Sequence, residues 1–362
     1  MKTFNSSSSR RWLVFGAILL SAGIPASGFT SHDADAAFAA YNTSFYVVSN
    51  GFGYYKKNTD GGHADYWKQA EEIEMILDVY ERTGSPDHRR MITESINGFT
   101  NNFGPDWKGN KFNDDIMWMT IACARGYLAT GNSAFRDLAR HHFDMVYRRA
   151  WDHTLGGGLY WSTDNGSKNA CVNGPAVIAA CYLYEICGDS NYLATAKALY
   201  AWERNTLFNS TNGAVSDNIR WDGSLAPRVF TYNQGTFIGA ANHLKKLTGD
   251  TGYYNDALLA ANYTKNILCR GGNLPAYGSG DAAGFNGIFM RWMARFVKDN
   301  KLGSTFNEWM SNNANAAWNV RRADNLSWQD WNSATPVGPL DSWNCSDTVV
   351  ILQVVPPEQL RP

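Results

Sequence analysis

The sequence predicts an all-α fold in which six helical hairpins close into an (α/α)6 toroid. Two observations indicate this fold. A hairpin-like segment recurs along the chain, and in each copy a glycine ends the apolar run that forms the first helix. The marker glycines stand at positions 84, 131, 188, 249 and 303, which gives intervals of 47, 57, 61 and 54 residues. Hydrophobic residues make up 44% of the chain and charged residues 18%, which allows one large core.

Each repeat is predicted to be a pair of helices. An apolar run with helical periodicity ends at the marker glycine, as in residues 182–188, and a second amphipathic run follows, as in residues 192–202. A glycine at this place typically takes the left-handed conformation that ends a helix. The unit is therefore an apolar helix, a tight turn and a more polar helix.

Two unpaired helices can complete the ring. One is expected at about residues 33–48, before the five visible hairpins, and the other at about residues 340–355, after them. Together they would supply the sixth pair. An open solenoid is the alternative, but such arrays seldom carry long glycine- and aromatic-rich loops at every second junction.

The longer links should gather at one end of the ring. They precede each apolar helix, whereas the glycine turns lie at the opposite end. Catalytic residues concentrate on loops held by a rigid scaffold, so the end with the long links is the predicted active face. The end with the tight turns is expected to be inert.

The chain is predicted to be exported. Residues 1–28 are typical of a signal peptide, with basic Lys2, Arg10 and Arg11, an apolar run at 12–24 and small residues at 26–28. Residues 29–362 should form a single catalytic domain. No cysteine stands directly after the leader and no hydrophobic tail ends the chain, so we expect a secreted protein without a membrane anchor. We also expect a monomer.

Charge and cysteines narrow the function classes. The net charge is −1 and no basic stripe is present, which argues against nucleic acid as a partner. The six cysteines permit disulfides in an exported protein. Cys181 and Cys187 share one predicted helix, six residues apart, and should not bridge each other. No metal site and no cofactor are predicted, because no motif for either occurs.

An aspartate pair opens the second apolar helix. Asp114 and Asp115 precede the apolar residues 116–122. Such a pair is often only a helix cap, but this one stands on the predicted active face. Adjacent side chains can bring their carboxyls to roughly 5–5.5 Å, the separation of a retaining glycosidase. The helix N-terminus favours the anion on one carboxyl, and repulsion raises the proton affinity of the other.

Several segments resemble the family 76 glycoside hydrolases. They are residues 113–118 (Asn-Asp-Asp-Ile-Met-Trp) with 127–131, and residues 169–176, 231–240 and 281–291. The resemblance implies an (α/α)6 fold and endo-α-1,6-mannanase activity on α-mannan. It also implies that Asp114 is the nucleophile and Asp115 the general acid/base. Met119 departs from the pattern, because a second tryptophan is common there.

Polar and aromatic residues of the same loops are candidate contacts to a polysaccharide substrate. They are Trp107, Asn113, Trp161, Asn173, Tyr232, Asn233, Gln234, Asp281 and Phe285. For the amides, satisfying the loop backbone is the alternative role, and for Asp281 it is capping a helix. The tryptophans could instead plug the ring.

Three rival functions remain open at this point. A transglycosylase of the same fold would pass the sugar to another glycan. An unsaturated uronyl hydrolase would need a basic patch for the substrate carboxylate, and the predicted face shows little beyond Lys108, Lys111 and Lys168. A non-catalytic glycan-binding toroid would have no need of both aspartates.

Overall fold

The computed structural model describes residue 1 and residues 28–357. Apart from its two end residues, the predicted signal peptide, residues 1–28, lies outside this part. Within it are twelve α helices, namely α1 (Ser31–Phe45), α2 (Tyr66–Thr83), α3 (Pro86–Phe103), α4 (Asn113–Thr130), α5 (Ser133–Ala150), α6 (Ala170–Cys187), α7 (Ser190–Thr206), α8 (Thr231–Thr248), α9 (Thr251–Tyr263), α10 (Phe285–Asp299), α11 (Gly303–Asn319) and α12 (Ser342–Val354).

Two small antiparallel sheets lie among the links. The first joins β1 (Tyr46–Ser49), β2 (Phe52–Asn58) and β3 (Gly61–His63). The second joins β4 (Ser167–Asn169), β5 (Asn218–Arg220) and β6 (Leu225–Ala226). In β4 and β5, Ser167 pairs with Arg220 and Asn169 with Asn218. Both sheets belong to links that precede inner helices.

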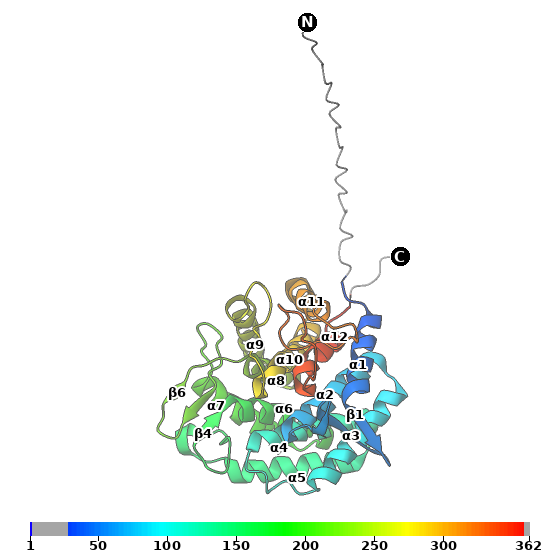
Figure 1. Ribbon diagram of the computed structural model, residues 1–362. Helices are drawn as coiled ribbons and strands as arrows, with labels where there is room; N and C mark the ends of the chain where they lie inside the picture. Colours follow the sequence, from blue (N-terminus) through cyan, green and yellow to red (C-terminus); the bar gives the residue numbers. More distant parts are fainter. Residues whose placement is uncertain (2–27, 358–362) are drawn as a thin grey trace.

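The helices form a closed double ring. The even-numbered helices pack one against the next, from α2 to α12, and α12 also packs against α2. They lie inside, and the odd-numbered helices surround them (Figure 1). Helix α1 packs on α12 and completes the sixth hairpin across the two ends of the chain. The predicted (α/α)6 toroid is confirmed, and contact between α12 and α2 excludes the open solenoid.

Four of the five marker glycines end inner helices as predicted. Gly84, Gly131, Gly188 and Gly249 follow α2, α4, α6 and α8 with φ of 64°, 75°, 68° and 77°. The prediction for Gly303 is wrong. Helix α10 ends at Asp299, Lys301 takes the left-handed conformation with φ 56°, and Gly303 begins α11.

Helix α6 shows how apolar the inner ring is. By length and composition alone it could cross a membrane, yet 78% of that stretch is buried inside the protein. An inner helix touches neighbours on all sides and therefore carries apolar residues around its whole circumference. All six cysteines are free, so Cys181 and Cys187 on this helix form no bridge, as expected.

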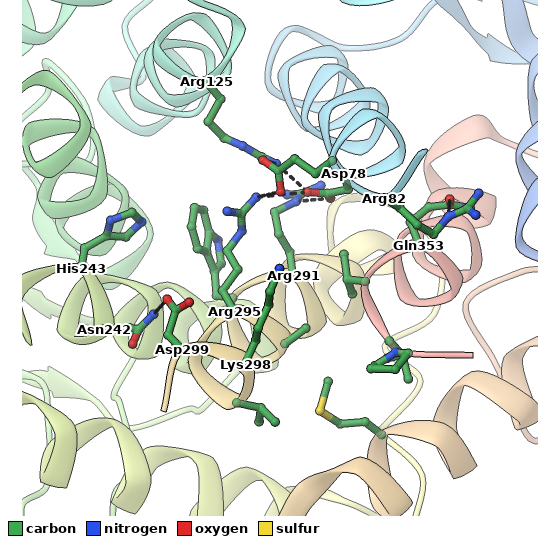
Figure 2. A pocket seen from close by; sticks show the side chains of 18 of the residues that line it. Asp78, Arg82, Arg125, Asn242, His243, Arg291, Arg295, Lys298, Asp299 and Gln353 are labelled. Atoms are coloured by element: carbon green, nitrogen blue, oxygen red, sulfur yellow. Dashed lines mark hydrogen bonds and ion pairs between the residues drawn. The ribbon is translucent and has the colours of Figure 1, made fainter. Parts of the chain in front are cut away.

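Buried charges join the inner helices near the centre of the ring. Arg125 of α4 binds Glu74 at 2.5 Å and Asp78 at 2.7 Å. Arg291 of α10 binds Asp78 at 2.6 Å and also pairs with Glu71. Figure 2 shows Arg125 and Arg291 reaching Asp78 from opposite sides. All five side chains are at most 2% exposed, so α2 is tied to two other helices where water cannot screen the charges.

Removing one arginine from this cluster should destabilise the fold. Arg291→Met leaves Glu71 without its cation and takes one of three arginines from Asp78, which should lower the free energy of unfolding by about 3–5 kcal/mol. Urea denaturation followed by circular dichroism measures the change. The control is Arg136→Met, which removes an exposed pair with Asp137 and should leave the midpoint unchanged. Equal losses in both variants would contradict the role of the cluster.

Candidate active site

A cleft opens at the end of the ring where the inner helices begin. Its volume is about 990 Å³, near the upper end of the roughly 300–1,000 Å³ of ligand pockets. Seven aromatic side chains line it: Trp67, Phe112, Trp118, Trp161, Phe230, Tyr232 and Phe285. Six aspartates and two arginines line it as well: Asp65, Asp114, Asp115, Asp164, Asp217, Asp281, Arg220 and Arg228.

The aspartate pair lies in this cleft, in the first turn of α4. Asp114 Oδ2 accepts hydrogen bonds from Trp161 Nε1 at 2.9 Å and from Cys171 Sγ at 3.3 Å. Asp114 Oδ1 is buried and has no hydrogen-bond partner among the described residues. Asp115 Oδ2 accepts from Asn110 Nδ2 at 2.9 Å. Both carboxyls are thus held by side chains of other segments, which a simple helix cap would not require.

Burial sets the protonation of the pair. Burial raises the pKa of Asp114 to about 7, and the neighbouring charge of Asp115 adds to the effect. Burial also raises the pKa of Asp115, to about 6, and the charges of Asp281 and Asp65 act in the same direction. The two carboxyls therefore hold a proton between them near neutral pH. One acid and one carboxylate in the same cleft are what general acid and nucleophilic catalysis require.

Lys68 joins two sides of the cleft. Its ammonium group lies 2.8 Å from Asp65, just before α2, and 3.0 Å from Asp281, just before α10. Its side chain is only 10% exposed, whereas that of Asp281 is 74% exposed. The lysine fixes the two segments relative to each other, and its charge offsets the two aspartates nearest to Asp115.

Four of the predicted substrate contacts line the cleft. Trp161 is 37% exposed at its rim, and Asp281 is the exposed partner of Lys68. Tyr232 and Phe285 stack on each other, with ring centroids 3.8 Å apart and planes at 17°. These two rings come from the first turns of α8 and α10, so they form one apolar surface opposite α4.

Trp107 and Asn113 lie behind the cleft wall, which corrects the expectation that they contact substrate. Trp107 is 2% exposed, and its ring stacks on His142 at 3.7 Å. The amide of Asn113 donates to the Tyr160 carbonyl at 2.8 Å and accepts from Arg149 at 2.7 Å. Asn113 thereby anchors the start of α4, and with it the position of the two aspartates.

The three predicted amides are also buried, and their partners are protein groups. Asn173 accepts from the backbone of Leu159 at 2.8 Å, and Gln234 accepts from the backbone of Val215 at 2.6 Å. Asn233 donates to Asp217 at 3.1 Å, and Asp217 itself lines the cleft. The expectation of direct sugar contacts is corrected for all three, because each amide is buried and bonded to protein groups, although Oδ1 of Asn233 has no hydrogen-bond partner among the described residues.

Several cleft residues were not found from the sequence. Arg220 belongs to the β5–β6 hairpin, Asp217 directly precedes it and Arg228 follows it, whereas this link is expected from the sequence to contribute only from Phe230 onward. The Asp222–Gly223 step was an available signal, since Asp-Gly steps mark tight hairpin turns. Cys171 gave no signal, because an isolated cysteine in an apolar helix is typical of packing.

The cleft is rich in negative charge. Its six aspartates face two arginines, so an anionic ligand would meet repulsion along most of the wall. This balance weighs against a uronic acid substrate, which requires a basic patch. A neutral ligand with hydroxyl groups fits both the acceptors and the aromatic surfaces.

A larger cavity, of about 1190 Å³, opens at the opposite end of the ring. It is lined by the last turns of the inner helices, and its acids Asp78 and Glu81 are paired with arginines (Figure 2). Basic side chains at helix C-termini compensate the helix dipoles. Asp78 and Glu81 are thus paired within the protein, and the basic side chains that line this cavity outnumber the acidic ones, which is the reverse of the cleft.

The match to a family model decides the classification. The model of glycosyl hydrolase family 76 covers residues 31–352. The chain belongs to this family. With the cleft and its acid pair, this membership identifies the protein as a glycoside hydrolase.

Solved structures agree with the family 76 assignment. The α-1,6-mannanase GH76A of Salegentibacter sp. HEL1_6 is 31% identical, with 90% of this chain and 98% of that chain covered and a TM-score of 0.83. The Lin0763 protein of Listeria innocua is 25% identical over 90% and 96% of the two chains, with a TM-score of 0.82. A family 76 mannosidase of Bacteroides thetaiotaomicron, 19% identical over 89% and 96% with a TM-score of 0.75, shares the fold. No curated protein sequence matches.

The raised pKa of Asp114 makes a prediction about the stability of the family 76 enzyme. The unfolded chain ionises this carboxyl near pH 4 and the folded protein only near neutral pH, so stability is lost across that window. Asp114→Asn removes this loss. The Tm of the variant should therefore rise relative to wild type as the pH increases from 4 to 8, which differential scanning calorimetry measures. A constant difference across this range would show that the carboxyl is not perturbed.

Proposed function

We propose that the enzyme is an exported, retaining endo-α-1,6-mannanase that hydrolyses the backbone of α-1,6-linked mannan. The main support comes from the Salegentibacter GH76A, whose inactive variant has asparagine at two consecutive aspartates and is in complex with α-1,6-mannotriose. The present sequence contains a single Asp–Asp step, at 114–115, and this step lies in the cleft. The pair and its position carry the proposal.

Asp114 is assigned as the nucleophile and Asp115 as the general acid/base. In the free enzyme Asp114 has the higher pKa because it is more deeply buried. Bound substrate covers Asp115 as well, so burial then raises the pKa of both carboxyls to a similar extent. The difference then lies in the donors: Asp114 accepts two side-chain hydrogen bonds and Asp115 one, which favours the anion on Asp114.

The reaction then proceeds by two displacements. Asp114 Oδ1 forms a bond to the anomeric carbon while the glycosidic bond breaks, and the leaving oxygen takes the proton of Asp115. Asp115 next takes a proton from water, which attacks the same carbon and releases Asp114. Oδ1 has no hydrogen-bond partner among the described residues, so a bond at this oxygen, once substrate reaches it, would cost no existing hydrogen bond.

The cleft also supports a neutral polymer as substrate. The exposed Trp161 offers a flat apolar surface for a pyranose ring, and the largely buried stack of Tyr232 and Phe285 adds an apolar part to the cleft wall. The remaining aspartates offer acceptors for hydroxyl groups. The predicted leader in residues 1–28 supports export, since a polysaccharide is met outside the cell. Protein from the culture medium should begin near residue 29, which N-terminal sequencing tests.

Digestion of a linear α-1,6-mannan tests the substrate and the roles. Wild type should release oligosaccharides, and Asp114→Ala or Asp115→Ala should lower kcat by about 10²–10⁴-fold. Asp137→Asn is the control, because Asp137 is an exposed aspartate that pairs with Arg136 at 2.9 Å and lies outside the cleft. It should retain activity within a few-fold. Acceptor elongation without hydrolysis, or binding without products, would contradict the proposal.

A further inference from the structure

Cys171 touches the proposed nucleophile. It lies in the first turn of α6, is 5% exposed and lines the cleft. Its sulfur is 3.3 Å from Asp114 Oδ2, the same oxygen that accepts from Trp161. Burial raises the pKa of the thiol, and the neighbouring charge of Asp114 raises it further, so the group stays protonated. A protonated thiol beside a carboxylate can only donate.

A second residue acts on the thiol. Tyr232 of α8 lies beside Cys171 of α6, and each of the two groups shifts the pKa of the other. Because Cys171 also donates to Asp114 of α4, three inner helices meet at the thiol. Tyr232 is held in turn by its stacking on Phe285. The thiol therefore stands between this aromatic part of the cleft wall and one carboxylate oxygen of Asp114.

We propose that Cys171 is a positioning residue of the glycosidase reaction. With Trp161, its thiol fixes Asp114 Oδ2 and thereby the orientation of the carboxyl group that attacks the anomeric carbon. The inference rests on the proposed nucleophilic role of Asp114. It assigns to a buried cysteine a function that packing alone would not require, since alanine at this place in the helix would serve packing.

Apart from Trp161 and Cys171, no described side chain near Asp114 donates a hydrogen bond to its carboxylate. Asp115 stands beside it on α4, and Asp217 faces Cys171 and Tyr232 from the link before β5. Asp65 and Asp281, bridged by Lys68, act on Asp115. Without the thiol, only Trp161 would hold Asp114 among the described side chains. The anion would then be less favoured, and the pKa of Asp114 should rise.

Two substitutions at one position test the proposal. In Cys171→Ala, we expect the acidic limb of the pH profile of kcat/KM to move upward by about half a pH unit and kcat to fall by about tenfold. Cys171→Ser keeps a donor and should return both values toward wild type. Cys181→Ala is the matched control, because Cys181 is a fully buried cysteine on the same helix and does not line the cleft. It should leave the limb unchanged.

A titration that needs no substrate separates the two proposals. Carbon-13 NMR of labelled aspartate carboxyls should show a higher pKa for Asp114 in Cys171→Ala than in wild type. Unchanged titration and an unchanged pH limb would overturn the role of Cys171, while mannan hydrolysis by wild type would stand. A shifted titration in a protein that releases no oligosaccharide would keep the thiol contact and overturn the mannanase function instead.

Discussion

One constraint governs this structure: every inner helix must begin at the same end of the ring. Tight turns return the chain from each inner helix to its outer partner, so the longer links can meet only at the opposite end. Ring closure by α12 against α2 brings the first and last of these links together. The result is a cleft whose walls come from segments more than 200 residues apart, as the Lys68–Asp281 contact illustrates.

The same burial that makes the ring stable gives the acid pair its chemistry. Asp114 and Asp115 start a helix in the wall of a closed ring, so both lose water and both bind protons more strongly. Trp161, Cys171 and Asn110 then decide which oxygens are held and which remain free. Size alone does not identify the site. The larger cavity lies at the other end, where arginines bind the buried carboxylates and basic side chains outnumber acidic ones.

The sequence predicts the ring because its signals are local. A glycine in a left-handed turn and an apolar run both act over a few residues, and Gly131 and Gly249 could be recognised from those residues alone. Gly303 was misread because Lys301 takes the left-handed conformation there, which a lysine can do at a modest cost. The aspartate pair was predictable as well, since it stands directly before an inner helix.

The partners of the site residues could not be predicted, because they depend on contacts between distant segments. Gln234 and Asn173 look like sugar-binding amides until the loops that they hold are seen in three dimensions. Trp107 stands in the same link as the cleft residue Phe112, yet its ring is covered by His142. The opposite holds for Cys171. The sequence shows only a cysteine in an apolar helix, and the packing of α6 on α4 brings it into contact with Asp114.

The central claim is that two adjacent carboxyls act on one sugar carbon through a covalent intermediate. Proton NMR during the first minutes of α-1,6-mannan hydrolysis tests it most directly, because the anomeric signals of the products appear before mutarotation mixes them. Two displacements predict the α-anomer first. Initial release of the β-anomer would mean a single displacement by water and would contradict the assignment of Asp114 as the nucleophile.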